Sequence, residues 1–299
     1  MTDHATQRTC LITGSRGYLG GRVKARFQQE GWNVVELTRN PSPEEVRAGR
    51  AIVFQLGENV SSEPLRGAEA LVHCAHDFSL RDWRGIFHTN VLGGDKLFQA
   101  ARAAGVKRQI FISSISAFEG CRSMYGQSKL EVEKRLAAAN VLLVRPGLIY
   151  GDRPQGIFGN LVRQVAGAKV LPVFNGGSQV LYLTHDDDLC QMLCRHADGQ
   201  FPAGPEPVTA AHEQGWPLRS ILETVAQAQG KTVRYLSIPW RFAWLGLKTL
   251  ELCHLPTRFR SDSFVSLVHQ NLHPSFELTQ RLGLKFRAFP PEPSALRPE

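Results

Sequence analysis

The eight residues TGSRGYLG near the N-terminus limit the fold of this chain more than any other feature. They directly follow an apolar run at residues 9–13 and open an amphipathic segment at residues 19–29, so a strand, a turn and a helix are expected in succession. Three glycines at this spacing permit a tight turn, a close backbone approach to a pyrophosphate and close packing of helix on strand. The first helical amides would bind the phosphates, and glycines that only turn the chain are the alternative. The expected cofactor contacts in this turn are Gly14, Ser15, Arg16, Gly17, Tyr18, Leu19 and Gly20.

Short apolar runs alternate with amphipathic segments over the first half of the chain. The runs occupy residues 9–13, 33–37, 51–56, 70–73, 109–112 and 141–144. They have the length and composition of buried parallel strands. The amphipathic segments, each long enough to cross back over a sheet, occupy residues 19–29, 91–104 and 123–138. This repetition predicts an α/β fold with a doubly wound, parallel, Rossmann-type sheet.

The pattern changes after Pro146, where glycine and proline interrupt the helical segments. We expect residues 1–165 to form an NAD(P)-binding domain. Residues 166–299 would form a smaller mixed lobe that binds substrate and is interleaved with the first domain. Such a lobe would cap the cleft at the carboxyl ends of the strands, where open α/β sheets bind ligands. Its apolar segment at residues 240–255 indicates either a helix packed on the core or a lid or membrane-surface patch for an apolar substrate.

The end of the second predicted strand indicates which dinucleotide binds. NAD usually requires an acidic residue there, which binds the ribose hydroxyls. This chain has Thr38, Arg39 and Asn40 instead, and Arg16 lies in the glycine turn. A guanidinium presents paired donors to phosphate oxygens, so Arg39, helped by Arg16, would bind a 2′-phosphate. We therefore predict NADP(H) over NAD(H), with Thr38 and Arg39 as contacts; an exposed arginine without a ligand is the alternative.

Tyr125 and Lys129 in the segment YGQSK are four residues apart in a predicted helix, so their side chains share one face. A tyrosine is a poor base at neutral pH, but an adjacent ammonium favours its phenolate and lowers its pKa. Tyr125 would then take a proton from an alcohol or deliver one to a carbonyl. The same spacing also arises by chance, but here it follows Ser113 and Ser114 at a predicted strand end, where a hydroxyl would hold the substrate oxygen.

Other predicted strands end at the same edge and add candidate contacts. Ala75 follows the strand at residues 70–73, and we expect it to contact the cofactor. His76 would line the substrate pocket, with local packing as the alternative. Pro146 follows the strand at residues 141–144 and is a further candidate substrate contact.

The segments TGSRGYLG, NVLGGDKLFQAARAAGVK, ISS, YGQSK, LLVRPGLIYGD and THDDDL together resemble the extended or atypical short-chain dehydrogenase/reductases, the NAD(P)-dependent epimerase/dehydratase group. The resemblance implies that Tyr125 is the acid/base and that Lys129 binds the nicotinamide ribose. It also implies that Ser114 positions the substrate oxygen and that Asn90 supports the proton relay. The implied function is that of an oxidoreductase or epimerase acting on an alcohol or carbonyl carbon of a sugar, in particular a nucleotide-linked sugar.

Several positions depart from the patterns of this group. Sugar-nucleotide dehydratases have an Asp-Glu pair where this chain has Ser116 and Ala117, so dehydration is disfavoured. Nucleotide-sugar epimerases usually have an arginine where this chain has Leu181, and their catalytic hydroxyl aligns with Ile115 instead of Ser114. Two alternatives therefore stay open: a reductase of a non-sugar ketone, and a non-enzymatic NADP(H)-binding sensor or assembly subunit.

Charge and cysteine content narrow the partners and the location. The net charge of +8 is not gathered into a basic cluster with interleaved aromatics, so we expect a small anionic ligand and no nucleic acid. The six cysteines have no disulfide-framework spacing, no export segment precedes the first strand, and no apolar run approaches the roughly 20 residues that span a bilayer. We expect a cytoplasmic protein without an integral membrane segment. The resemblance also allows a homodimer.

Two clusters resemble metal ligands but have simpler interpretations. His185 precedes Asp186, Asp187 and Asp188, and carboxylates of this kind are favoured at the start of a helix by its free amides and dipole. Cys190 and Cys194 are one helical turn apart, and buried cysteines of this spacing are typical of a core stripe. We therefore predict no metal site.

Overall fold

The computed structural model describes residues 8–153, 155–252, 261–290 and 296. Its centre is a seven-stranded sheet in which every paired strand is parallel to its neighbour. The strands are β1 (Thr9–Thr13), β2 (Asn33–Thr38), β3 (Ala51–Val53), β4 (Ala70–His73), β5 (Arg108–Ile112), β6 (Val141–Pro146) and β10 (Val208–Ala210). Their spatial order, β3-β2-β1-β4-β5-β6-β10, confirms the predicted doubly wound Rossmann-type sheet.

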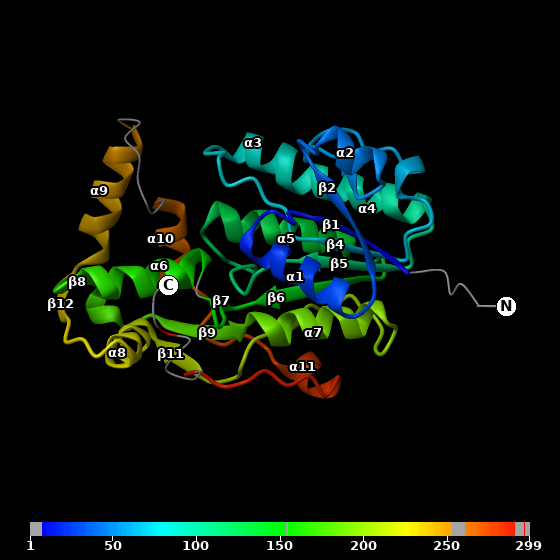
Figure 1. Cartoon of the computed structure of the whole chain (residues 1–299). Coiled ribbons are helices and arrows are strands. Elements are labelled where there is room, and N and C mark those ends of the chain that lie inside the picture. Colours follow the sequence, from blue (N-terminus) through cyan, green and yellow to red (C-terminus); the bar gives the residue numbers. More distant parts are fainter. Residues whose placement is uncertain (1–7, 154, 253–260, 291–295, 297–299) are drawn as a thin grey trace.

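Helices cover both faces of this sheet (Figure 1). Helices α1 (Tyr18–Gln29) and α7 (Asp186–Ala197) pack on one face, where Phe27 and Cys190 enter a common core. Helices α4 (Gly93–Ala103) and α5 (Met124–Leu136) pack on the other, through residues such as Phe98 and Val132. Cys194 lies in the same buried cluster as Cys190, so the predicted core stripe is confirmed.

Most predicted elements lie within two residues of the observed bounds, and two differ by more at one end. The strand predicted at residues 51–56 ends at Val53, because its single sheet neighbour, β2, ends opposite it at Thr38. The helix predicted at residues 91–104 begins earlier, as a π-helical stretch from Phe87 to Leu92 that continues into α4. The apolar periodicity did not reveal this wider turn, which includes Asn90.

The smaller lobe contains a three-stranded and a two-stranded sheet. The first is formed by β7 (Leu148–Tyr150), β9 (Val180–His185) and β11 (Gly215–Pro217), with one parallel and one antiparallel pairing. The second is formed by β8 (Val170–Phe174) and β12 (Arg234–Ile238). Helices α6 (Gly156–Gly167) and α8 (Leu218–Ala228) pack against them around a separate apolar core. The expected smaller mixed lobe is therefore present.

The remaining helices are short or lie at the surface. They are α2 (Pro43–Arg47), α3 (Trp83–Ile86), α9 (Trp240–Leu252), α10 (Ser261–Val268) and α11 (Glu277–Arg281), with 3-10 turns at Glu63–Leu65 and Asn175–Gly177. Two elements beyond residue 165, β10 and α7, lie on the central sheet, so the lobe and the sheet domain are interleaved along the chain. The division after residue 165 stays a prediction.

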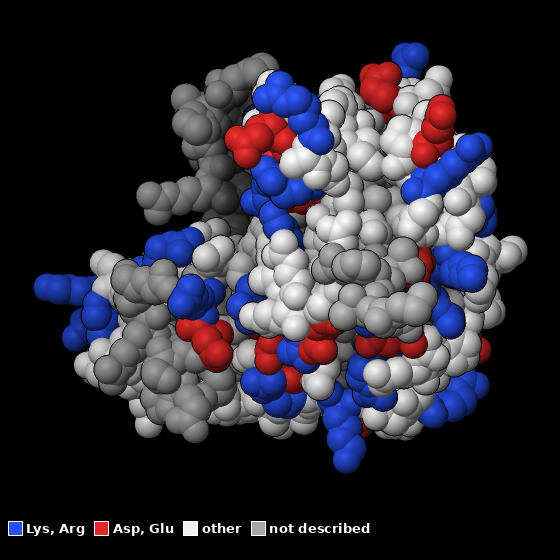
Figure 2. All heavy atoms as spheres, turned by 45° about the vertical axis from the view of Figure 1, so that its right-hand side comes forward, with Lys and Arg blue, Asp and Glu red and all other residues white. Residues whose placement is uncertain are grey.

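Helix α9 stands out from the body of the molecule (Figure 1), and Phe242 on it is 71% exposed. Its described part packs against α10, and none of its described side chains belongs to a buried cluster; residues 253–255 of the predicted segment lie outside the described residues. Within the described chain, no helix combines the length and apolar character needed to cross a bilayer. On the face shown in Figure 2, basic and acidic side chains are interspersed.

Candidate active site

The candidate site lies at one edge of the central sheet. Because the strands are parallel, the residues that follow β1, β4, β5 and β6 meet at the same edge. Gly14, Ala75, Ser114 and Gly147 are found there, directly after or one residue beyond their strands. Gly14, Ala75 and Ser114 are sequence-predicted contacts that are thus brought to one region, whereas Gly147 was not predicted and directly follows the predicted Pro146.

The glycine turn forms a cradle that larger residues would fill. Gly14 has a φ of +69°, and a Cβ on it would lie 2.9 Å from the Ala75 amide nitrogen. A Cβ on Gly20 would lie 2.1 Å from the Gly14 carbonyl oxygen, so α1 packs directly on the turn. The Gly17 amide closes the turn on the Gly14 carbonyl at 3.0 Å, and Gly17 is the N-cap of α1. This backbone fits a dinucleotide pyrophosphate, which would be held by amides at the start of α1.

Thr13 ties this turn to the end of β4. Its hydroxyl oxygen accepts hydrogen bonds from the amides of Cys74 and Ala75, each at 3.1 Å, and lies 2.7 Å from Nδ1 of His73. Burial lowers the pKa of His73 to about 3, so its imidazole is neutral. Because the Thr13 oxygen already accepts two amides, its hydroxyl is the donor to Nδ1 in the tautomer that fits this geometry. Thr13 was not among the predicted site residues, and a threonine ending an apolar run carries no signal of this contact.

The other side chains of the turn point to protein neighbours. Ser15 donates to the Glu36 carboxylate in β2, and Leu19 packs against the core beneath α1. Arg16 donates to the Asn40 carbonyl at 3.0 Å and lies 3.4 Å from a Glu45 carboxylate oxygen. In this structure a cofactor would therefore contact the backbone of these residues. The Arg16 side chain contacts Asn40, which precedes α2, and Glu45 in α2.

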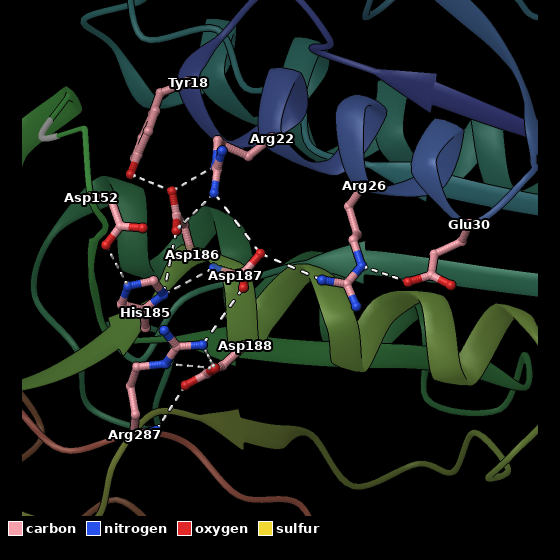
Figure 3. A network of polar contacts seen from close by, with 10 residues as sticks. All are labelled: Tyr18, Arg22, Arg26, Glu30, Asp152, His185, Asp186, Asp187, Asp188 and Arg287. Atoms are coloured by element: carbon pink, nitrogen blue, oxygen red, sulfur yellow. Dashed lines mark hydrogen bonds and ion pairs between the residues drawn. The ribbon is translucent and has the colours of Figure 1, made fainter.

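Tyr18 enters a polar network that joins α1 to α7 (Figure 3). Its hydroxyl donates to the Asp186 carboxylate at 2.9 Å, and Arg22 lies 2.8 Å from the same buried carboxylate. His185 caps α7 by accepting the Asp187 amide at 3.2 Å. The acidic run predicted to start a helix therefore forms the first turn of α7, and its carboxylates form ion pairs with arginines of α1 and with Arg287.

Thr38 and Arg39 lie at the end of β2, beside the glycine turn. Thr38 is half-buried and is the last residue of the strand, whereas Arg39 is exposed. Arg39 has no hydrogen bond or ion pair with another described residue, in contrast to Arg16. Its guanidinium is therefore available to an external anion.

Tyr125 and Lys129 share one face of α5, with Lys129 Nζ 6.0 Å from the Tyr125 ring centroid. Lys129 is 4% exposed and donates to the Ile112 carbonyl at the end of β5, at 2.8 Å. Ser114 lies beside Tyr125 and lowers the pKa of its hydroxyl, whereas Ser113 is buried and its hydroxyl has no partner within the described residues. Of the two predicted serines, Ser114 is the one that contacts Tyr125.

Burial controls the protonation of both groups. It raises the pKa of Tyr125, which the neighbouring Ser114 hydroxyl lowers to a smaller extent. Burial also lowers the pKa of Lys129 to about 8, against the opposing effects of Cys74 and Glu133. The site therefore holds a protonated phenol beside a lysine that is still largely protonated at neutral pH.

Asn90 and Pro146 have mainly backbone partners. The Asn90 amide group accepts from the Asp77 nitrogen at 2.7 Å and donates to the Asp77 carbonyl at 3.2 Å, so its side chain fixes the loop after β4. Neither of these hydrogen bonds reaches Tyr125 or Lys129. The Pro146 carbonyl accepts the Ile115 amide at 3.0 Å, which joins the ends of β5 and β6.

Two aromatic rings flank Tyr125. The His76 ring meets it edge-on at 5.1 Å, and the Phe78 ring stacks on it at 5.7 Å with an interplanar angle of 27°. Phe78 is 60% exposed. His76 was predicted to lie in this region, but Phe78 was not, because nothing in the local sequence distinguishes it from a surface loop residue.

A glycine cradle at the carboxyl edge of a parallel sheet and a Tyr-Lys pair on the adjoining helix define an NAD(P)-binding, Rossmann-type protein of the short-chain dehydrogenase/reductase class. The chain matches the NAD dependent epimerase/dehydratase family over residues 10–201, more than half its length. It belongs to that family, which confirms the resemblance.

Individual relatives differ in what they act on. The chain is 29% identical to a ceramide reductase from Caulobacter vibrioides, over 76% of this chain and 73% of that protein. It is also 29% identical to a UDP-glucose 4-epimerase from Vibrio cholerae, over 57% of this chain and 60% of the epimerase. A crystal structure of UDP-glucose 4-epimerase from Thermotoga maritima superposes with a TM-score of 0.70, at 17% identity, over 97% of this chain and 96% of the other. That structural likeness shows the fold alone.

Proposed function

We propose that this protein is an NADP(H)-dependent carbonyl reductase in which Tyr125 donates the proton. The observation that carries the proposal is the placement of Tyr125, Lys129 and Ser114 at the sheet edge that also holds the glycine cradle. Because burial raises the pKa of Tyr125, the resting phenol is protonated and suited to giving a proton to a carbonyl oxygen.

The reduction divides between the cofactor and the chain. When bound in the glycine cradle, NADP(H) would supply the hydride that the carbonyl carbon accepts. The Ser114 hydroxyl, which lies beside Tyr125, would hold the carbonyl oxygen, and Tyr125 would transfer its phenolic proton to that oxygen to complete the alcohol. Lys129, beneath the ring, would stabilise the phenolate until solvent returns the proton.

The preference for NADP(H) rests on the end of β2. Thr38 and Arg39 occupy the positions where an acidic residue would bind the ribose hydroxyls of NAD. Arg39 is exposed and unpaired within the described chain, so it can contact a 2′-phosphate without breaking an existing ion pair. Arg16, which contacts Asn40 and Glu45, would have to exchange partners to help.

The surroundings of Tyr125 favour an apolar ketone over a nucleotide sugar. The exposed Phe78 ring and the His76 ring lie directly against the phenol and form an aromatic wall. Leu181, where nucleotide-sugar epimerases usually have an arginine, packs against the lobe core. The similarity to a ceramide reductase agrees with an apolar substrate. The similarity to a UDP-glucose 4-epimerase keeps nucleotide-sugar epimerisation as the second candidate.

The test measures NADPH oxidation with a long-chain methyl ketone, alongside interconversion of UDP-glucose and UDP-galactose. We expect the ketone to be reduced, and Tyr125→Phe to lower kcat by about a thousandfold while NADPH binding is retained. Tyr235→Phe, whose hydroxyl has no partner within the described residues, is the matched control.

Two other outcomes would contradict the proposed reductase and support a different function. Interconversion of the UDP-sugars with a retained cofactor would establish the epimerase instead. NADPH binding without either reaction would favour the sensor or assembly subunit.

Two further inferences concern location and assembly. The five cysteines within the described residues are free thiols, in keeping with the predicted cytoplasmic location. A homodimer stays a prediction, which light scattering of the purified protein would test.

A further inference from the structure

The helix that carries Tyr125 is capped by a residue from the smaller lobe. Asp262, in α10, accepts hydrogen bonds from the amides of Met124 at 2.7 Å and Tyr125 at 3.0 Å. The local cap, Ser123, accepts the Gly126 amide at 3.1 Å. The first three amides of α5, which have no acceptor within the helix, are thus all hydrogen-bonded. Two of them, those of Met124 and Tyr125, donate to the Asp262 carboxylate, which lies 138 and 137 residues away in sequence.

Helix α10 also contacts the loop that carries Ser114. Ser266 lies four residues after Asp262, on the same face of α10, and its hydroxyl donates to the Ser116 hydroxyl at 3.0 Å. Ser116 in turn donates its amide to the Ser114 hydroxyl at 3.1 Å. One face of α10 therefore contacts the Tyr125 backbone directly and reaches the Ser114 hydroxyl through Ser116.

The loop and the helix are closely packed where α10 joins them. A Cβ on Gly126 of α5 would lie 2.3 Å from the Ser116 carbonyl oxygen, so no side chain fits between them. On the opposite side, Phe264 of α10 is buried and its ring meets Phe174 of β8 edge-on at 4.1 Å. Helix α10 is thus fixed to the lobe by an aromatic contact and to the site by two polar ones.

We propose that Asp262 and Ser266 are positioning residues that set the distance between Ser114 and Tyr125. The catalytic part of this inference rests on the proposed reductase function. Tyr125 is the second residue of α5, so its backbone position follows directly from the bidentate contact with Asp262. Docking of the smaller lobe through α10 thereby brings Ser114 and Tyr125 together. Movement of the lobe away from the central sheet would release both Ser114 and Tyr125.

Hydrogen exchange tests the contact without any substrate. In the full-length protein with NADPH, we expect Asp262→Ala to raise amide exchange in the first turn of α5 by about tenfold or more, because two amides lose their acceptor. Asp262→Asn, which keeps one acceptor oxygen, should give a smaller rise. Ser263→Ala, on the exposed side of the same helix, is the control and should change nothing. Unchanged exchange in both Asp262 variants would overturn the proposal.

Kinetics with the long-chain ketone test the positioning role. Displacement of Tyr125 by a fraction of an ångström should lower kcat by about tenfold or more in Asp262→Ala, with KM and the Kd for NADPH within about twofold of wild type. Ser266→Ala should show a smaller loss, and Asp262→Asn should restore part of the rate. A variant that unfolds at lower temperature but keeps the wild-type kcat would show a structural role only and overturn the inference. Wild-type turnover in Tyr125→Phe would instead refute the proposed reductase, while the exchange data would still decide the contact.

Discussion

Replacing Gly20 by alanine should separate α1 from the glycine turn. The added Cβ would lie 2.1 Å from the Gly14 carbonyl oxygen, 0.9 Å inside the 3.0 Å limit that real Cβ atoms respect, and 2.6 Å from the Gly14 carbonyl carbon. These are backbone atoms, so the helix must move by about an ångström and cannot relieve the contact by a rotamer change. We expect Gly20→Ala to destabilise the fold by about 2 kcal/mol, in the range of overpacked core sites.

The same movement displaces the amides that would hold the pyrophosphate. NADPH affinity should therefore fall by at least about tenfold, which corresponds to roughly 1.4 kcal/mol. Gly21→Ala is the matched control, because its Cβ would lie 3.4 Å from the Ser15 carbonyl oxygen, an ordinary contact, and alanine favours the helix by up to about 1 kcal/mol. Thermal unfolding and a fluorescence titration with NADPH measure the two effects. Wild-type binding and stability in Gly20→Ala, or equal damage in Gly21→Ala, would refute the reasoning.

Arg39→Ser should raise the Kd for NADPH by about tenfold or more and leave the Kd for NADH unchanged, because it removes a charge-assisted contact to the 2′-phosphate. Arg47→Ser, at the end of α2, is the control in the same titration, and equal effects on both cofactors would contradict the assignment. His73 titrates at a pKa of about 3 instead of 6.5, so the unfolded chain binds more protons between these values and stability is lost as the pH falls from 6.5 to 3. The loss should reach at most about 4 kcal/mol, and urea unfolding of His73→Gln across this range should show a shallower pH dependence than wild type; an identical dependence would rule out a buried neutral His73.

The strands and the glycine turn could be predicted because their signals are local. The predicted runs at residues 9–13 and 70–73 have the same bounds as β1 and β4. Both strands are central and buried on both faces, so an uninterrupted apolar run marks their length. At the sheet edge this signal fails: β3 ends earlier than its apolar run, because pairing with β2 and not hydrophobicity sets its end.

The contacts that complete the candidate site are not local and leave no pattern in the sequence. Asp262 caps α5 across more than a hundred residues, and an aspartate at the start of α10 looks like a residue that serves its own helix. Phe78 packs on Tyr125 from the loop after β4, in which Asn90 binds the backbone of Asp77. For Arg16, the sequence suggested a phosphate ligand, whereas the structure pairs it with Asn40 and Glu45. The partner of each of these side chains depends on which surfaces the fold brings together.

The tyrosine–lysine spacing predicts that Tyr125 and Lys129 share one face of a helix, as they do in the structure. The protonation of Tyr125 differs from what the spacing suggests. From the sequence, the ammonium of Lys129 should lower the pKa of Tyr125 and produce a base. In the structure Lys129 donates to the Ile112 carbonyl, and burial raises the pKa of Tyr125. The resting group is then a phenol, which must give up its proton before it can act as a base. Because Ser114 lies beside that hydroxyl, an incoming carbonyl oxygen would meet two hydroxyl donors, which supports the proposed proton donation by Tyr125.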